Sequence, residues 1–250
     1  DVFTGDGIDT VNVQSVHANT VTMVDTGPGN DLLEVSDTAK TVDHIDNELI
    51  VQMGAGADEL IVNDNGESSN NTATITTDTV LGLDLHATGI SYLGTETLHV
   101  ESGEGNDLVT ITGSAPVRTT LSTYGGNDII EVIDASSVLE INGGEGEDDI
   151  YVRAIGGTTT IQGDGGDDDI YANFRYVPDT SGGDARLQDC SCEQTGANGL
   201  DPYTLNLHGN EGSDTYEVGL AGVGGALINA YDMGGNVGND TLLVYGTELP

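Results

Sequence analysis

A short glycine-aspartate pattern recurs nine times along the chain and constrains its fold more than any other feature. Typical copies are GDGIDTVNV from Gly5, GEGNDLVTI from Gly103 and GEGEDDIYV from Gly144. Each copy has an aspartate, and a glycine lies two positions before it. The aspartates are Asp9, Asp31, Asp58, Asp107, Asp128, Asp148, Asp168, Asp214 and Asp240. The glycines are Gly7, Gly29, Gly56, Gly105, Gly126, Gly146, Gly166, Gly212 and Gly238. Such self-similarity is the signature of a repeat architecture.

Apolar residues flank the aspartates at fixed positions, which predicts a strand on each side of the turn. Strand residues follow at the second and fourth positions, as in Leu33 and Val35, and an apolar residue lies seven positions before, as in Val24. This period-two alternation is typical of half-buried strands. Most aspartates are 20 to 27 residues apart, which is room for two strands and two turns. The sequence therefore predicts an all-β, right-handed parallel β-solenoid, β-helix-like or β-roll-like, with 20–25 residues per coil and one Gly-rich Asp turn per coil.

Two intervals between aspartates are about twice as long as the others. They measure 49 residues between Asp58 and Asp107 and 46 between Asp168 and Asp214. We interpret each as two coils of which one lacks the motif, at residues 63–102 and 173–208. Residues 175–202 form the longest irregular stretch and are predicted to be a protruding loop. We expect residues 1–250 to be a single solenoid segment of a longer protein or fibre.

The residue types in the repeated turn favour calcium as a ligand. Glycines allow backbone carbonyls to point toward one place, and an aspartate two residues later adds a carboxylate. Hard oxygen ligands without nitrogen or sulfur are those that Ca²⁺ prefers. We therefore expect all nine aspartates to bind through their side chains and all nine glycines through their carbonyls. The ions would form one row along one edge of the solenoid. The alternative is that each aspartate only hydrogen-bonds its own turn.

The repeat Gly-x-Gly-x-Asp-x-apolar-x-apolar resembles the haemolysin-type (repeats-in-toxin) calcium-binding repeat. That resemblance covers nearly the whole chain and implies a β-helical fold, calcium and an extracellular setting. In that family the Gly-rich turn recurs about every nine residues on both sides of a β-roll, whereas here it recurs every 20-odd residues. In this respect the chain is more similar to the one-sided calcium solenoids of large bacterial surface adhesins, some of which bind ice.

The charge of the chain excludes several classes of partner. There are 43 acidic and 5 basic residues, which gives a formal net charge of −38. Nucleic acids and anionic membranes attract basic surfaces, so neither is an expected partner. No apolar run approaches the roughly 18 residues of a membrane span. The two cysteines, Cys190 and Cys192, are too close for a relaxed disulfide and more typical of loop thiols than of a metal site.

These observations favour a non-catalytic, calcium-stabilised structural rod of an extracellular filament, surface layer or adhesin stalk. Its partners would be neighbouring solenoid segments or copies of itself, stacked end to end through open strand edges, and also cell-surface glycans. One alternative is a carbohydrate-active β-helix, a lyase or an epimerase. Against it, the basic residues and histidines do not cluster in one phase of the repeat. The other alternative is a glycan-binding or ice-binding adhesin module, although the turns carry no ladder of threonines for ice.

Overall fold

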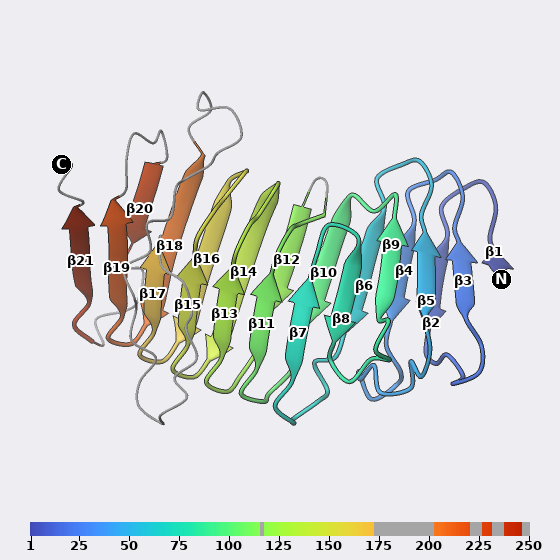
Figure 1. The fold of residues 1–250 in the computed structure, drawn as a ribbon, viewed down its shortest axis with the longest axis horizontal. Helices are drawn as coiled ribbons and strands as arrows, with labels where there is room; N and C mark the ends of the chain where they lie inside the picture. Colours follow the sequence, from blue (N-terminus) through green and yellow to red (C-terminus); the bar gives the residue numbers. More distant parts are fainter. Residues whose placement is uncertain (116–117, 173–202, 221–226, 232–237, 247–250) are drawn as a thin grey trace.

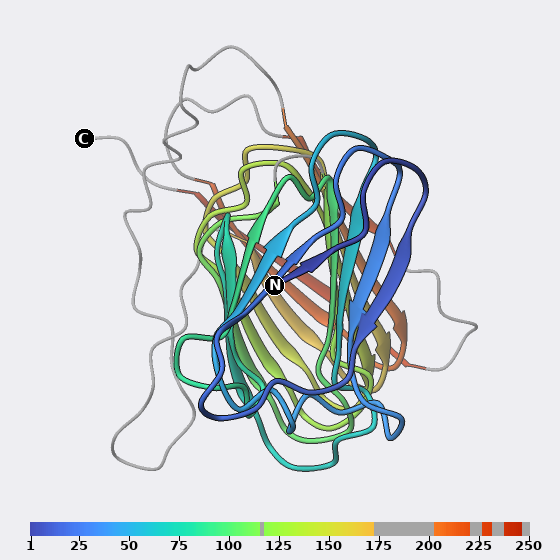
Figure 2. The same ribbon diagram turned by 90° about the vertical axis from the view of Figure 1, so that its right-hand side faces the viewer.

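The computed structural model describes residues 1–115, 118–172, 203–220, 227–231 and 238–246. All described elements are β-strands, and they form two long sheets that face each other across a narrow core (Figures 1 and 2). The strands within each sheet are parallel, except for one reversed strand in the larger sheet. The prediction of a parallel β-solenoid is confirmed.

Over the described residues, the larger sheet, sheet A, has 12 strands and the smaller, sheet B, has nine. In spatial order, sheet A consists of β1 (Val2–Phe3), β3 (Thr22–Asp25), β5 (Leu49–Gln52), β9 (Ile90–Leu93), β8 (Thr79–Gly82), β7 (Thr72–Ile75), β11 (Leu108–Ile111), β13 (Ile129–Val132), β15 (Asp149–Val152), β17 (Asp169–Ala172), β19 (Thr215–Leu220) and β21 (Thr241–Gly246). Sheet B consists of β2 (Thr10–Val13), β4 (Leu32–Val35), β6 (Glu59–Asn63), β10 (Thr97–Glu101), β12 (Arg118–Ser122), β14 (Val138–Glu145), β16 (Thr159–Gly165), β18 (Thr204–Glu211) and β20 (Leu227–Tyr231).

The core consists of aliphatic side chains stacked in register from coil to coil. Ile130 lies opposite Ile150, which lies opposite Ile170, and all three are fully buried. The apolar position seven residues before the aspartate is buried at Val24, Val51, Val100, Leu121, Ile141, Ile161 and Leu207, whereas Val2, in the outermost described coil, is exposed; Met233 lies outside the described residues. This alternation of buried and outward residues matches the period predicted from the sequence.

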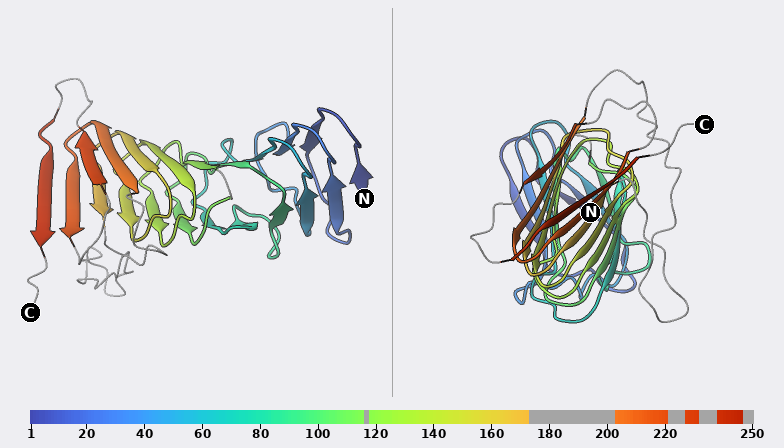
Figure 3. Two further views of the ribbon diagram at one scale, coloured as in Figure 1. Left: turned by 90° about the horizontal axis from the view of Figure 1, so that it is seen from above. Right: turned by 90° about the vertical axis from the view of Figure 1, so that its left-hand side faces the viewer.

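Each coil turns at two edges, and the repeated motif lies in these turns. At the first edge, the upper one in Figure 1, a strand of sheet A leads into a strand of sheet B. At the second edge, a strand of sheet B leads back into sheet A. The views along and across the rod show both edges running its length (Figures 2 and 3).

A β-hairpin interrupts the regular winding in the middle of the rod. β8 runs antiparallel to both β7 and β9, so that β7, β8 and β9 all lie in sheet A between β5 and β11. The tight turn of this hairpin is capped by Thr76, whose Oγ1 accepts the backbone N–H of Thr79 at 2.9 Å. The prediction that residues 63–102 form a plain coil without the motif is therefore wrong. They contain the hairpin and β10, and the 49-residue interval spans one and a half coils plus two extra strands.

The second long interval contains one coil and not the predicted two. β16 pairs directly with β18, and β17 pairs directly with β19. The extra length of the interval therefore lies in the connection from β17 to β18. The predicted loop 175–202 and most of the predicted degenerate coil 173–208 lie outside the described residues, as do Cys190 and Cys192.

Candidate metal-binding rows

The repeated motif occupies both edges of the solenoid and changes edge at the hairpin. Its first three copies, with Asp9, Asp31 and Asp58, connect sheet A to sheet B and so lie at the first edge. The six later copies connect sheet B to sheet A at the second edge; their aspartates are Asp107, Asp128, Asp148, Asp168, Asp214 and Asp240. The prediction of a single row along one edge is wrong, because an odd number of strands, β6 to β10, separates Asp58 from Asp107, whereas two described strands separate the other successive copies.

Row 1 is the ladder of carboxylates at the first edge. The backbone N–H of Asp9 donates to Asp31 Oδ1 at 2.9 Å, and the N–H of Asp31 donates to Asp58 Oδ1 at 2.8 Å. The N–H of Asp58 in turn donates to Glu96 Oε2 at 2.9 Å. Each carboxylate thus binds the main chain of the coil before it, which joins two coils and not two residues of one turn.

Row 2 repeats the same geometry at the second edge over a longer distance. It begins at Asn71, whose N–H donates to Asp107 Oδ1 at 2.8 Å, and it continues coil by coil to Asp240. The five further N–H to Oδ1 bonds, of 2.8 to 3.0 Å, link Asp107 to Asp128, Asp128 to Asp148, Asp148 to Asp168, Asp168 to Asp214, and Asp214 to Asp240. All nine predicted aspartates therefore lie in these two rows.

The residues before several of the aspartates form a second ladder that runs in the opposite sense. The N–H of Asn127 donates to Asn106 Oδ1 at 3.0 Å, and the N–H of Glu147 donates to Asn127 Oδ1 at 3.2 Å. Here the side chain belongs to the earlier coil and the N–H to the later one, whereas in the aspartate rows the side chain belongs to the later coil. Neighbouring turns are therefore joined in both directions.

The glycines two positions before the aspartates allow the turns to stack this closely. At Gly126 φ is +113°, and a Cβ would collide with the carbonyl oxygen of Gly105 in the previous coil. Gly29 does not have a positive φ, but a Cβ there would collide with the carbonyl oxygen of Gly7. The requirement shared by these turns is thus the close approach of two backbones, and a left-handed conformation adds to it at some copies only.

The second oxygen of most row aspartates is buried and has no hydrogen-bond partner. This holds among the described residues for Oδ2 of Asp31, Asp58, Asp107, Asp128, Asp148 and Asp168. Burial raises the pKa of Asp128 to about 7, of Asp148 to about 6 and of Asp168 to about 8, and it also raises the pKa of Asp58 and Asp107. A buried carboxylate with a free oxygen requires either a proton or a cation.

The donor chemistry of the rows fits calcium, which the resemblance to haemolysin-type repeats implies. The rows present oxygen atoms only, and each of these buried carboxylates has one oxygen to spare. The glycine five positions before Asp148, Asp168 or Asp214 leaves space for the carboxylate, since a Cβ at Gly143, Gly163 or Gly209 would collide with Oδ2. In the rows as described, no three acidic side chains converge on one point, so the remaining ligands of an ion would be main-chain carbonyls.

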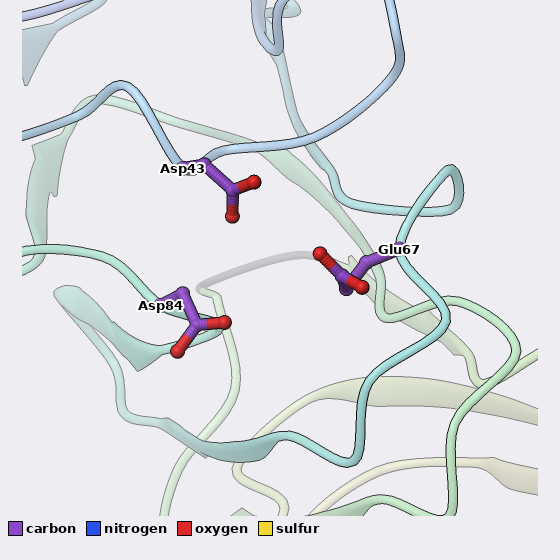
Figure 4. A group of neighbouring side chains, drawn as sticks. All are labelled: Asp43, Glu67 and Asp84. Atoms are coloured by element: carbon purple, nitrogen blue, oxygen red, sulfur yellow. The ribbon is translucent and has the colours of Figure 1, made fainter.

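One group of three acidic side chains does converge in the described part of the chain. The carboxylates of Asp43, Glu67 and Asp84 come from three connections at the second edge and face one another, with ligand atoms within 4.8 Å of one another (Figure 4). Behind them is Asp64, fully buried, whose oxygens accept the N–H of Val42 and the side-chain amide of Asn71, each at 3.0 Å. Burial and these three carboxylates raise the pKa of Asp64 to about 8. Nothing in the sequence pattern pointed to this cluster.

Two residues of the rows were not predicted from the sequence, because they lie outside any copy of the motif. Glu96 takes the place of an aspartate at the end of row 1, and Asn71 takes it at the start of row 2. For Glu96 the available signal was its position directly before β10, which corresponds to the position of Asp58 directly before β6.

Comparison with known proteins gave no relative. No protein-family model, no curated protein and no solved structure matches the chain. Among the described segments there is also no helix long and apolar enough to cross a membrane.

Proposed function

We propose that the chain is a segment of a non-catalytic, calcium-stabilised structural rod of an extracellular filament, surface layer or adhesin stalk. The observation that carries this proposal is the direction in which the side chains of the repeated aspartates point. The aspartates that recur in nearly every coil are turned inward, and each binds the backbone of the neighbouring coil. A feature that recurs along the whole length and joins each coil to the next serves the integrity of the rod.

Electrostatics supports calcium as part of this rod. The chain carries a formal charge of −38, and in the described residues the three basic side chains Lys40, Arg118 and Arg153 are each already paired with a glutamate. Within the described part of the chain, no basic side chain is therefore paired with the carboxylates of Asp31, Asp58, Asp107, Asp128, Asp148 and Asp168. Calcium bound along the rows would supply the positive charge, and the millimolar calcium found outside cells matches the affinity of many extracellular calcium modules.

The outermost strands support an end-to-end partner. Leu242 and Val244 of β21 are 55% and 56% exposed, although the equivalent residues of the inner coils are fully buried. A further coil with the same period, whether from the same chain or from another copy, would cover these side chains and pair with the free edge of the strand.

The arrangement of histidines favours a structural role over a carbohydrate-active enzyme. His99 pairs with Glu59 at 3.1 Å, His44 lies 3.4 Å from Asp37, and His208 stacks on Tyr231. These three side chains lie on different coils, and each has a local partner.

The test is folding with and without calcium. We expect circular dichroism to show a β-rich protein with cooperative melting in millimolar CaCl₂, and loss of that transition in excess chelator at pH 7.5. MgCl₂ at the same ionic strength is the control, because Mg²⁺ dehydrates reluctantly and demands octahedral geometry. An identical spectrum and melting temperature in calcium and in chelator would refute the calcium part of the proposal.

A further inference from the structure

Row 1 ends at a turn that is shorter than the motif turns. Gln52 pairs with Leu93 in sheet A, and Glu59 pairs with Thr97 in sheet B. Between these paired positions the motif turn has six residues, 53–58, and the turn that stacks on it has three, 94–96. The short turn lies directly on the long one, since a Cβ on Gly94 would come within 2.9 Å of the backbone nitrogen and oxygen of Gly54.

Glu96 compensates for the shorter turn with a longer side chain. It lies opposite Asp58, and its Oε2 accepts the Asp58 N–H as an aspartate carboxylate does at the other rungs. The chain beyond it continues without a further motif copy at this edge, because the next motif, at Asp107, is at the second edge. Glu96 therefore provides the last carboxylate, or terminal rung, of row 1; a rung here means one carboxylate together with the backbone N–H of the previous coil that it accepts.

Two buried oxygen atoms at this rung lack a partner among the described residues. One is Oδ2 of Asp58, which is 1% exposed, and the other is Oγ1 of Thr95, also in a residue that is 1% exposed. The charges that act on Asp58 are those of Glu96 and Asp31, and both are negative. The nearest basic residue in the next coil, Arg118, donates its backbone N–H to the Glu96 carbonyl, but its guanidinium pairs with Glu140.

We propose that Asp58, Thr95 and Glu96 form a terminal cation site that closes row 1, with a hard divalent cation such as Ca²⁺ bound by their free oxygens. Glu96 is then a metal ligand that lies outside any Gly-x-Gly-x-Asp motif. The site supplies the positive charge and the oxygen-binding partner that the buried atoms of this rung otherwise lack. This proposal depends on the proposed function, because it assumes that the rows bind calcium.

The experiment counts the ions bound by matched variants of the full chain. Glu96→Gln keeps the length of the side chain and an oxygen that can accept the Asp58 N–H, but removes the charge. Glu101→Gln is the control, since it makes the same charge change on the outward face of β10, five residues away. Bound Ca²⁺ per chain is measured by equilibrium dialysis with atomic absorption, and Tb³⁺ luminescence reports site affinity. We expect Glu96→Gln to bind one ion fewer than the wild type, and Glu101→Gln to bind the same number.

Glu96→Asp distinguishes a ligand from a simple negative charge. The carboxylate is retained but shortened, so it no longer reaches across the three-residue turn, and we expect this variant to lose the ion as well. Thr95→Val removes the hydroxyl at nearly constant shape and should weaken the site roughly tenfold.

The outcomes separate this proposal from the one on which it depends. If the wild type binds several ions and Glu96→Gln binds as many as Glu101→Gln with equal affinity, the terminal site is refuted and the rod proposal stands. If Glu96→Asp retains the ion fully, the proposal that the longer glutamate side chain is needed to reach the ion would likewise be contradicted. If the wild type binds no calcium at all, both proposals fail together.

Discussion

The N-terminal region (residues 1–63) and the C-terminal region (residues 108–220) use the same motif at opposite edges of one rod. In the N-terminal region the motif leads from sheet A to sheet B, and the plain connections of residues 14–21 and 36–48 lie at the second edge. In the C-terminal region the motif lies at the second edge, and the plain connections of residues 133–137 and 153–158 are short. The ladder bonds nevertheless have the same donors, acceptors and lengths in both regions.

The comparison teaches that the motif specifies a turn and a contact with the next coil, but not an edge. Each rung needs only another rung stacked one strand spacing away, about 4.8 Å. Both edges of a two-sheet solenoid provide this. The edge is therefore determined by whether an even or an odd number of strands separates two copies, and the five strands β6 to β10 between Asp58 and Asp107 change it.

The largest effect is expected from a methyl group at a stacked glycine. Gly126→Ala should cost about 3 kcal/mol or more, because the Cβ would collide with the Gly105 backbone and φ is +113°. The control is the neighbouring Gly125→Ala, where the nearest atom is the flexible end of Glu104 and the cost should be about 1 kcal/mol or less. The measurement is urea unfolding in calcium.

The same substitution in the N-terminal region should be milder. Gly29→Ala collides with Gly7, but Gly7 belongs to the outermost described coil, where Gly5 and Gly7 have open space and can move. We expect about half the cost of Gly126→Ala. Equal costs at Gly29 and Gly126 would show that the end coil is as rigid as the middle.

The second effect concerns the rungs. Asp148→Ala deprives the buried Asp128 N–H of its acceptor and should cost about 2 kcal/mol by urea unfolding in calcium. Asp9→Ala, at the exposed end of row 1, removes only a hydroxyl contact from Thr4 and should cost about 0.5 kcal/mol or less. Asp148→Asn retains an acceptor for the N–H, so a full loss in this variant would mean that the charge matters more than the hydrogen bond.

The third effect is a pH dependence that differs between the rows. The pKa values of Asp128, Asp148 and Asp168, about 7, 6 and 8, exceed the value of about 3.9 of an unfolded aspartate. Between these limits the folded state binds more protons, so stability falls as pH rises. In chelator we expect the melting temperature to be highest near pH 5, to fall by about 5 °C or more as the pH rises, and the transition to be lost by pH 7.5.

Variants assign this pH dependence to a row. Asp168→Asn, in row 2, should reduce it clearly, and Asp58→Asn, in row 1, should reduce it less. With saturating calcium the dependence should largely disappear, because the ion replaces the protons. A melting temperature that rises with pH in chelator would contradict the assignment of these pKa shifts.

The smallest effect is expected from the surface ion pairs, in which the two regions should behave alike. Lys40 pairs with Glu34 at 2.6 Å in the N-terminal region, and Arg118 pairs with Glu140 in the C-terminal region. Lys40→Ala and Arg118→Ala should each cost about 0.5 kcal/mol, and still less at high salt. A cost above about 2 kcal/mol at either position would show that the ion pair contributes more to stability than exposed ion pairs ordinarily do.

Local features of the fold could be predicted from the sequence because they depend on local patterns. The alternation around Asp31 and Asp148 identified the strands on both sides of each turn, and residues such as Val24 and Ile141 are buried as predicted.

What could not be predicted depends on the count of strands and on contacts between coils. β8 and β9 lie in a stretch without a motif, so the hairpin had no local signal. The inward direction of the aspartates and the role of Glu96 follow from stacking, since their partners lie 20 to 46 residues away in the chain.

The hairpin acts on the stack as an edge dislocation acts on a crystal. β7 and β8 are two additional half-planes that are present in sheet A and have no counterpart in sheet B. At about 4.8 Å each they lengthen one side of the stack by roughly 10 Å. On either side of the defect the lattice is perfect, but the two blocks are in antiphase. Because it adds an even number of strands, the defect leaves the direction of winding unchanged. The acidic turns change direction because the connection of residues 94–96 lacks the motif and the next copy lies at the opposite edge.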